Sequence, residues 1–241
     1  MNNKLHIGIM AAGKGSRMES NLPKVLHQLN DKALIDYVLK TASKLNPKSI
    51  TMIVGFKKDV AINHTKKSNI DYVHQEEQLG TGHAVLQLAD KLEHKSGHLL
   101  ILSGDVPNIK SSSLKPIVEH HINNDHNATV ITAIVNDSSG YGRIVRDSAN
   151  NFIKIVEQKD CNGVENLIKE INSGIFIFKI SNLFKELRNI KSNNAQNEYY
   201  LTDVMELIGD KLPIHAKKIN NSTEVLGINT INQLNELENE N

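Results

Sequence analysis

Short apolar runs alternate with amphipathic stretches through the first half of the chain. Leu5–Met10, Ser49–Val54 and His98–Leu102 each have the length of a strand, and a helical stripe of apolar residues runs from Leu34 to Leu45. Strands separated by helices of about ten residues are typical of βαβ units and a mainly parallel sheet. The pattern therefore predicts an α/β fold whose strand-ending loops lie along one edge, where ligands bind.

In the second half of the chain the predicted strands are joined by short or irregular connections, which favour a mixed β layer. The remaining predicted strands are Ile70–Val73, Thr129–Val135, Arg143–Val145, Phe152–Val156, Ile171–Phe178 and Val225–Ile228. The remaining predicted helices begin after Lys57 and cover Gly82–Leu92, Leu114–Asn123, Leu183–Leu187, Tyr199–Leu212 and Ile231–Glu238. No repeat, low-complexity linker or compositional boundary divides the chain, so we expect one domain over residues 1–241.

Composition narrows the class of protein. The 241 residues are 39% hydrophobic and carry a net charge of only +1, which offers no global field for nucleic acid or for an anionic membrane. Cys161 is the single cysteine, so a disulfide within the chain and a four-thiolate zinc site are excluded. The apolar run Leu5–Ala12 is brief and is followed at once by cations, which favours a buried first strand over a signal peptide. We expect a cytoplasmic protein.

A glycine-rich loop follows this first strand. From Gly8 the sequence reads G-I-M-A-A-G-K-G, close to the phosphate-binding G-x-x-x-x-G-K-[ST], but Gly15 stands where that motif needs a hydroxyl for magnesium. The dinucleotide motif G-x-G-x-x-G also fails, because Met18 replaces its third glycine. Lys14, Arg17 and Lys24 nevertheless follow the strand, and small residues let backbone N–H groups approach a polyphosphate. The loop predicts a polyphosphate site of another kind.

Later segments carry further candidate chemistry. Gln75 offers both a donor and an acceptor to a base edge, and Gly80 and Thr81 stand just before a predicted helix. Asp105 follows the buried strand that ends near Leu102 and is framed by Gly104 and a proline, a favourable place for a magnesium ligand. A helix cap or turn is the alternative for these residues when each is taken alone.

Together these motifs resemble the sugar-nucleotide pyrophosphorylases, and most closely the N-acetylglucosamine-1-phosphate uridylyltransferases. The matching segments are A-A-G-K-G-S-R-M at 11–18, P-K-V-L at 23–26, Q-E-E-Q-L-G-T-G-H-A at 75–84, S-G-D-V-P at 103–107, G-Y-G-R-I at 140–144, E-I-N-S-G-I at 170–175, N-N-A-Q-N-E-Y-Y-L-T-D at 193–203 and L-G-I-N at 226–229. The resemblance runs from Ile9 to about Leu237 and implies a Rossmann-like α/β fold. Its nucleotide half covers about residues 1–110 and its sugar half about residues 111–241.

The resemblance also implies the roles of individual residues. UTP and N-acetylglucosamine 1-phosphate would be the substrates, Mg²⁺ the cofactor, and UDP-N-acetylglucosamine and pyrophosphate the products. The implied nucleotide-binding residues are Ala11, Ala12, Gly13, Lys24, Gln75, Gly80, Thr81 and Gly104. The implied catalytic residues are Arg17, Lys24 and Asp105, the sugar-binding residues are Gly142, Glu157 and Asn172, and the magnesium ligands are Asp105 and Asn229.

Several points stay open. Ser103 is a mild variation of the family's pattern, which often has an aromatic or small residue there, and Leu226 stands where the family commonly has an acidic residue. The family's bifunctional members continue into a left-handed β-helix of hexapeptide repeats with acetyltransferase activity. No such repeats occur in these 241 residues, so the sequence is either a single-activity enzyme or one domain of a longer protein, and the oligomeric state is undetermined. A relative that uses CTP or another sugar 1-phosphate, and a non-catalytic nucleotide-sugar-binding protein, remain alternatives.

Overall fold

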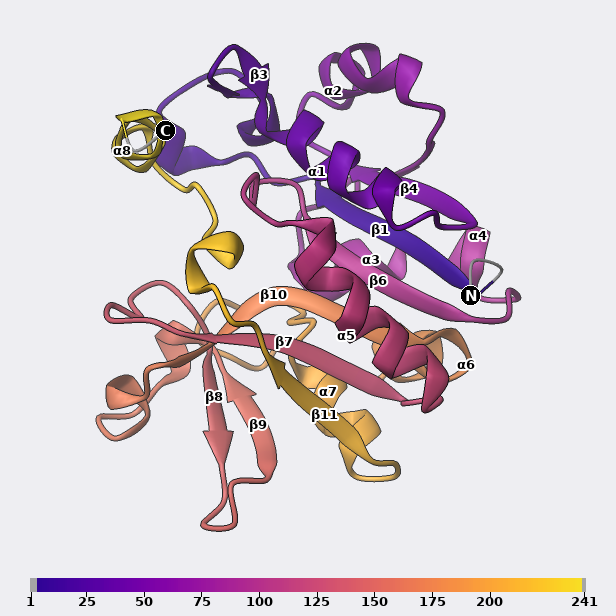
Figure 1. Ribbon diagram of the computed structural model, residues 1–241, viewed down its shortest axis with the longest axis vertical. Coiled ribbons are helices and arrows are strands. Elements are labelled where there is room, and N and C mark those ends of the chain that lie inside the picture. The colour runs from indigo at the N-terminus through magenta and orange to yellow at the C-terminus, as the bar shows by residue number, and fades with distance from the viewer. Residues whose placement is uncertain (1–3, 240–241) are drawn as a thin grey trace.

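A single mixed sheet forms the centre of the computed structural model, which describes residues 4–239 (Figure 1). Within that range nine strands pair into this sheet, and two very short strands form a separate hairpin. The strands of the sheet are β1 (Leu5–Ala11), β4 (Ser49–Val54), β5 (Asp71–His74), β6 (His98–Ser103), β7 (Ala128–Ile134), β8 (Arg143–Arg146), β9 (Phe152–Val156), β10 (Glu170–Lys179) and β11 (Ile214–Lys218). The small hairpin is β2 (Gln28–Leu29) and β3 (Lys32–Ala33).

The strand order is β11-β7-β10-β6-β1-β4-β5, with the hairpin of β8 and β9 attached to β10. Strands β6, β1, β4 and β5 are mutually parallel, whereas β10 is antiparallel to both β6 and β7. This arrangement confirms the predicted mixed, mainly parallel sheet. The parallel strands place the loops after β1, β4, β5 and β6 at one edge.

Helices cover both faces of the sheet (Figure 1). Their bounds are α1 (Leu34–Lys44), α2 (Lys58–Thr65), α3 (Thr81–Leu86), α4 (Ala89–Leu92), α5 (Ser111–Asn123), α6 (Ile180–Leu187), α7 (Asp203–Gly209) and α8 (Ile231–Asn239). Helices α1 and α5 pack on one face, and α3, α4, α6 and α7 pack on the other.

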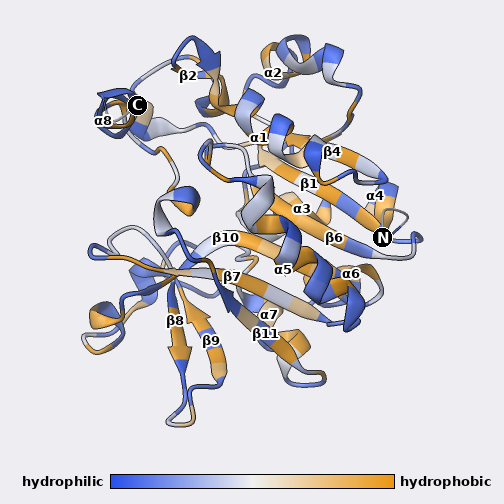
Figure 2. Ribbon diagram, viewed as in Figure 1, coloured by the Kyte–Doolittle hydropathy of each residue, from blue (hydrophilic) through white to orange (hydrophobic). Residues whose placement is uncertain are grey.

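The alternation of side chains along β6 explains why the sheet is covered on both faces. Leu100 and Leu102 belong to the core beneath α1 and α5, whereas Leu99 and Ile101 belong to the core beneath α3 and α6. All four are at most 1% exposed, as expected for a strand whose two faces are both buried. Figure 2 shows the same result as apolar strands between helices whose outer faces are polar.

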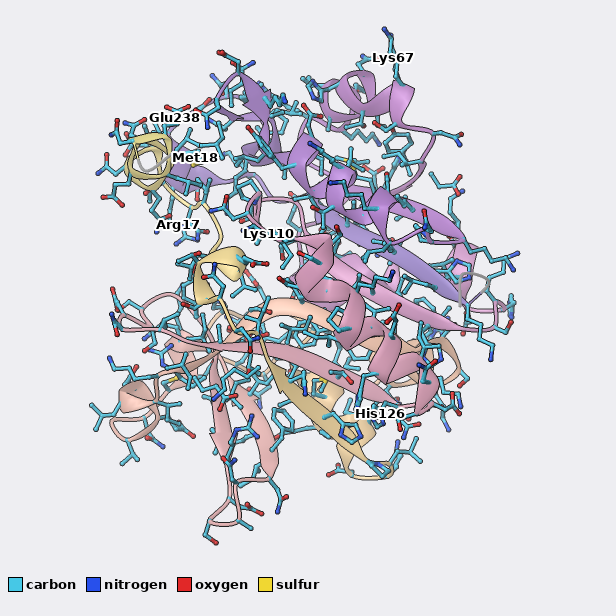
Figure 3. All side chains as sticks on the ribbon, viewed as in Figure 1. Arg17, Met18, Lys67, Lys110, His126 and Glu238 are labelled. Atoms are coloured by element: carbon cyan, nitrogen blue, oxygen red, sulfur yellow. The ribbon has the colours of Figure 1, made fainter. Side chains whose placement is uncertain are left out.

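A third, smaller cluster ties the C-terminal helix to the N-terminal half. Met18 is completely buried against Leu34, Ile228 and Leu234, so α8 packs beside the loop that follows β1. Figure 3 shows Met18 and Arg17 close to α8. Residues more than 200 positions apart in the chain therefore meet here, and Arg17 donates a hydrogen bond to Asn229.

Three expectations about elements were wrong. The strand expected at Val225–Ile228 is a 3-10 turn, Ser222–Val225, followed by irregular backbone. The real strand is β11, an edge strand whose half-exposed sequence I-H-A-K-K lacks a clear alternation of apolar residues. The helix expected at Tyr199–Leu212 is only Asp203–Gly209, because the backbone of Tyr199 pairs with the loop before α3. The helix expected at Gly82–Leu92 is divided into α3 and α4.

The two expected halves share the one sheet, and the outer limits of the expected domain, residues 1–3 and 240–241, lie outside the described residues. None of the helices in the described range is both long and apolar enough to cross a bilayer.

Candidate functional site

A pocket of about 310 Å³ opens where β1, β5 and β6 end. Eight residues singled out from the sequence line it, namely Ala11, Ala12, Gly13, Lys24, Gln75, Gly80, Thr81 and Asp105. They come from four separate segments, and the parallel strands bring those segments to the same edge. The position agrees with the general rule that open α/β sheets bind ligands beyond the carboxyl ends of their strands.

Gly13 and Gly15 of the first loop differ in backbone conformation and in packing. Gly15 has a φ of +65°, and a Cβ there would lie 2.6 Å from the Cβ of Lys24. Gly15 therefore allows the chain to turn back against Lys24 in a conformation that other residues rarely adopt. A Cβ on Gly13 would meet nothing within 4 Å, although Gly13 lines the pocket. Packing in the free protein therefore does not require a glycine at 13.

Gln75 also lines the pocket and is 3% exposed. Its side-chain nitrogen donates to the carbonyl of Gly80 at 3.0 Å, which holds the amide against the loop before α3. That loop is held in turn by the segment 199–201, because Tyr199 N donates to Leu79 O at 2.8 Å and Gly82 N donates to Tyr199 O at 2.7 Å. The G-T-G motif is therefore part of a supported loop and does more than cap a short helix.

Lys24 joins the two residues implied as metal ligands. Its ammonium donates to Asp105 Oδ2 in a close ion pair, and to Asn229 Oδ1 at 2.8 Å. Arg17 also donates to Asn229 Oδ1, at 2.8 Å. The side chains of Lys24 and Asp105 are 14% and 21% exposed, so their attraction is screened less than that of a surface pair. The fold thus brings all four predicted catalytic and metal-binding side chains to one place.

The chemistry of this cluster suits magnesium. Among residues 4–239, no group of three or more histidine, cysteine, aspartate or glutamate side chains is placed to hold a metal ion. Asp105 and Asn229 instead present one carboxylate and one amide oxygen to a shared cation, the ammonium of Lys24. Magnesium favours such hard oxygen ligands and is usually held by one or two carboxylates together with substrate phosphates. The donor set therefore fits the implied Mg²⁺.

The three residues implied in sugar binding also lie together. A Cβ on Gly142 would lie 3.3 Å from Glu157 Oε2 and 3.5 Å from Asn172 Cβ. Asn172 N donates to Gly142 O at 2.8 Å. Burial raises the pKa of Glu157, and the nearby charges of Asp160 and Glu198 raise it further, against the opposing hydrogen bond from Thr202. Glu157 forms no ion pair with any residue of the described range, unlike Asp105.

A bulge in β10 directs the side chain of Asn172. The register of β10 against β7 shifts between Asn172 and Phe176, and Gly174 has a φ of +74°. Asn172 Oδ1 accepts from Gly174 N at 2.9 Å, which closes a local turn within the bulge. Bulges of this kind re-aim side chains next to functional sites. A Cβ on Gly174 would lie 3.3 Å from Ser103 Oγ, so the bulge brings the sugar residues close to the end of β6.

Two more contacts connect the nucleotide and sugar residues. Thr202 Oγ1 donates to Glu157 Oε1 at 3.1 Å, so the segment 199–202 touches both the G-T-G loop and the sugar cluster. On the opposite side, Tyr141 Oη accepts from Gly227 N at 3.2 Å and Ile228 N donates to Asp105 O at 3.0 Å. The two groups of residues therefore belong to one continuous site.

Six of the predicted residues are outside the lining of the pocket, namely the three sugar-binding candidates, Asn229, Gly104 and Arg17. Gly104 N donates to Met10 O at 2.9 Å, and a Cβ there would lie only 2.9 Å from Val25, so Gly104 allows β1 and the end of β6 to meet closely. Arg17 reaches the site only through Asn229. Sequence reasoning assigned no role to Gln78, Ser103 and Glu198 of the lining or to Thr202. The only sequence signal for these residues is that they lie within the segments that resemble the family.

A larger cavity lies elsewhere. It measures about 990 Å³ and is lined by α7, by the start of β9 and by the segment that leads into β11, and neither Lys24 nor Asp105 belongs to its lining. Its walls contain Asp203, Glu206 and Asp210. Because an open groove can be large without any convergent chemistry, we place the functional site at the smaller pocket, where the cation-bridged cluster lies.

The fold and the site together define a nucleotidyl transferase. The sequence profile of the nucleotidyl transferase family matches residues 8–222, and the chain belongs to this family. In fold it is similar to a UDP-glucose pyrophosphorylase whose crystal structure was solved in complex with UDP-glucose. The TM-score is 0.79 with 19% identity, over 100% of this chain and 98% of the other.

Curated relatives are more similar in sequence. The chain is 42% identical over 222 residues to the bifunctional protein GlmU of Streptococcus uberis, which covers 92% of this chain and 48% of that protein. It is 43% identical to the bifunctional protein GlmU of Streptococcus pyogenes serotype M3 over the same shares. The chain thus spans about half the length of these relatives.

Proposed function

We propose that this chain transfers UMP from UTP to N-acetylglucosamine 1-phosphate and releases pyrophosphate. The observation that carries the proposal is the cluster of Lys24, Asp105 and Asn229, which adjoins both the nucleotide pocket and the residues around Gly142. Two substrates that react through their phosphates need such a cluster where the two binding regions meet. The similarity to the bifunctional protein GlmU supports this choice of reaction class.

In the proposed reaction a phosphate oxygen of the sugar phosphate attacks the α-phosphorus of UTP in line, and the bond to pyrophosphate breaks. The attacking phosphate monoester is largely ionised at neutral pH, with a second pKa of about 6, so no general base is required. The protein must position the two substrates and offset negative charge. Lys24 and Arg17 are the cations available for this at the cluster.

Asp105 and Asn229 would hold the Mg²⁺ ion, which, when bound, offsets the charge of the two facing phosphates. Lys24 already contacts both oxygen ligands, so it is placed to share the same negative charge. Asn229 is in turn aligned by Arg17 and by Gln233, whose Oε1 accepts from Asn229 N at 2.7 Å.

Selection of the two substrates is assigned to the two ends of the site. Gln75, Gly80 and Thr81 would bind the uracil, because amide and backbone groups can match the donors and acceptors of a base edge. Gly142, Glu157 and Asn172 would bind the sugar, where a carboxylate accepts from hydroxyl groups and an amide both donates and accepts.

The direct test measures pyrophosphate after incubation with UTP, N-acetylglucosamine 1-phosphate and Mg²⁺. We expect release well above background, and a loss of about a hundredfold or more in Asp105→Ala. No release from the native chain, or full activity in Asp105→Ala, would contradict the proposal. Replacing the sugar phosphate by glucose 1-phosphate, and UTP by CTP, separates this reaction from those of related enzymes. Binding without turnover of any pair would instead indicate a nucleotide-sugar-binding protein.

A further inference from the structure

The amide of Gln75 is held from two sides. Its nitrogen donates to Gly80 O at 3.0 Å and faces Nδ1 of His83 at 3.2 Å. A primary amide nitrogen carries two N–H donors, and these two contacts use both. His83 lies on α3 behind Gln75 and outside the lining of the pocket.

The carbonyl of Gly80 decides which way this amide points. The nitrogen and oxygen of a glutamine side chain are assigned from their partners, and a backbone carbonyl can only accept. The NH₂ group of Gln75 must therefore face Gly80 O, and its second N–H faces His83. It follows that Nδ1 of His83 accepts and that Nε2 carries the proton of the neutral ring.

The other side of His83 accommodates this tautomer only if the Gln87 amide turns. The side-chain nitrogen of Gln87 lies 3.1 Å from Nε2 and donates to His83 O at 3.0 Å, at the half-buried end of α3. Turning the amide exchanges the bond to His83 O for one in which the Gln87 oxygen accepts from the Nε2–H group, and water can reach this partly exposed position. Gln75 has no such freedom, because it is 3% exposed and tied to Gly80.

With both N–H groups occupied, Gln75 has only its carbonyl oxygen left for a ligand in the pocket. A carbonyl oxygen accepts from an N–H group and is repelled by a lone pair. Uracil carries N–H at N3, where cytosine has a lone pair. We infer that His83 is a positioning residue for nucleotide selection, which holds Gln75 in the amide orientation that favours a uracil over a cytosine nucleotide. This inference rests on the proposed function and adds to it a residue that acts through Gln75.

A matched pair of variants tests the inference. His83→Leu removes the acceptor, whereas His83→Asn places a side-chain oxygen near the position of Nδ1. We expect the ratio of kcat/KM for UTP to that for CTP to fall about tenfold in His83→Leu, since one hydrogen bond that selects the amide orientation is lost. The ratio should stay within about twofold of native in His83→Asn. Gln87→Leu, which leaves the Nδ1 contact in place, should also keep the native ratio.

A double-mutant cycle separates positioning from a general structural effect. In a Gln75→Leu background, His83→Leu should no longer change the ratio, because the residue through which it acts is gone. Equal losses for UTP and CTP in His83→Leu, or an undiminished fall in the Gln75→Leu background, would overturn the inference. Thermal melts of each variant show whether the fold is retained.

Calorimetric dissociation constants for UTP and CTP provide a second readout that does not need turnover. A native chain that prefers UTP in binding but releases no pyrophosphate would contradict the proposed transfer and still let the binding ratio test His83. A native chain that binds UTP and CTP equally would overturn the inference whatever its transferase activity.

Discussion

The proposed nucleotide and sugar ends of the site differ in the charges that surround their carboxylates. At the nucleotide end, Asp105 is paired with Lys24 and their shared partner Asn229 is also held by Arg17. At the sugar end, Glu157 receives a hydrogen bond from Thr202 and has Asp160 and Glu198 near it, and its pKa is raised. Cations at one end suit phosphates, and an unneutralised carboxylate at the other suits sugar hydroxyl groups.

The two ends are also built differently. The nucleotide end consists of loops that follow parallel strands, and its backbone and glycines are close to one another because the strands are neighbours. The proposed sugar end lies where antiparallel strands begin and end: Gly142 precedes β8, Glu157 follows β9 and Asn172 lies in β10. The pairing of β8 with β9 and the bulge in β10 bring these three residues together. Charge pairing therefore stabilises the nucleotide end, whereas the register of the strands positions the residues of the sugar end.

Removing the cation of the nucleotide end should have the largest effect. Lys24→Met is expected to lower kcat for pyrophosphate release about a hundredfold, because a charge-stabilising donor at the phosphates is worth about 3 kcal/mol. Steady-state assays at saturating substrates measure the change. Lys91→Met removes a surface ion pair with Asp71 and should leave kcat unchanged. A Lys24→Met enzyme with native kcat would show that the charge pairing of this end serves only the fold.

A neutral substitution at the sugar end should have a smaller and different effect. Glu157→Gln keeps the shape but weakens an acceptor for hydroxyl groups, so KM for the sugar phosphate is expected to rise about tenfold. KM for UTP should change little, because Glu157 is not part of the nucleotide pocket. Initial rates with each substrate varied in turn separate the two constants. Equal increases in both would show that the two ends are not independent.

The two glycines of the first loop distinguish folding from binding. Gly15→Ala places a Cβ 2.6 Å from that of Lys24 at a φ of +65°, so we expect a loss of stability of about 1–2 kcal/mol. Gly13→Ala meets no atom in the free protein and should leave the unfolding midpoint unchanged while weakening UTP binding. Denaturant unfolding and calorimetry measure the two effects. A Gly13→Ala protein with native affinity would argue against close approach of a ligand there.

The smallest effect concerns pH and the sugar end. Burial raises the pKa of Asp203 to about 6, with Glu206 and then Glu157 adding to the shift. The folded chain therefore binds the Asp203 proton more tightly than the unfolded chain, whose aspartate pKa is about 3.9. Stability must fall as pH rises between these two values, and the full cost is present above the higher one.

Asp203→Asn should remove this cost. Near pH 4 the variant and the native protein should be about equally stable, and near pH 7 the variant should be more stable by less than about 1 kcal/mol, since water screens a half-exposed group. Denaturant titrations at the two pH values measure the difference. A variant less stable than the native protein at neutral pH would show that the Asp203 charge is satisfied in the fold.

Much of the architecture could be predicted because hydrophobic periodicity reports burial. The predicted stripe from Leu34 to Leu45 corresponds to α1, and the predicted strand His98–Leu102 corresponds to β6, which is buried on both faces. Periodicity failed where burial was partial. Strand β11 is half exposed at the edge of the sheet, and Val225 and Ile228 are buried without being in a strand. The sequence also overestimated the helix after Tyr199, whose backbone pairs with a loop 120 residues earlier.

By itself, the sequence determined which residue types are available to the proposed site. The glycine loop with its cations, the acid after a buried strand, and the polar residues of the sugar half are local patterns, because each depends on residue type and on neighbours along the chain. Only the tertiary structure decided which of these meet. Lys24, Asp105 and Asn229 converge because β1 lies beside β6 and α8 packs on Met18, and Gly142, Glu157 and Asn172 converge through strand register. Contacts between distant residues depend on the packing of the whole chain, which local patterns do not encode.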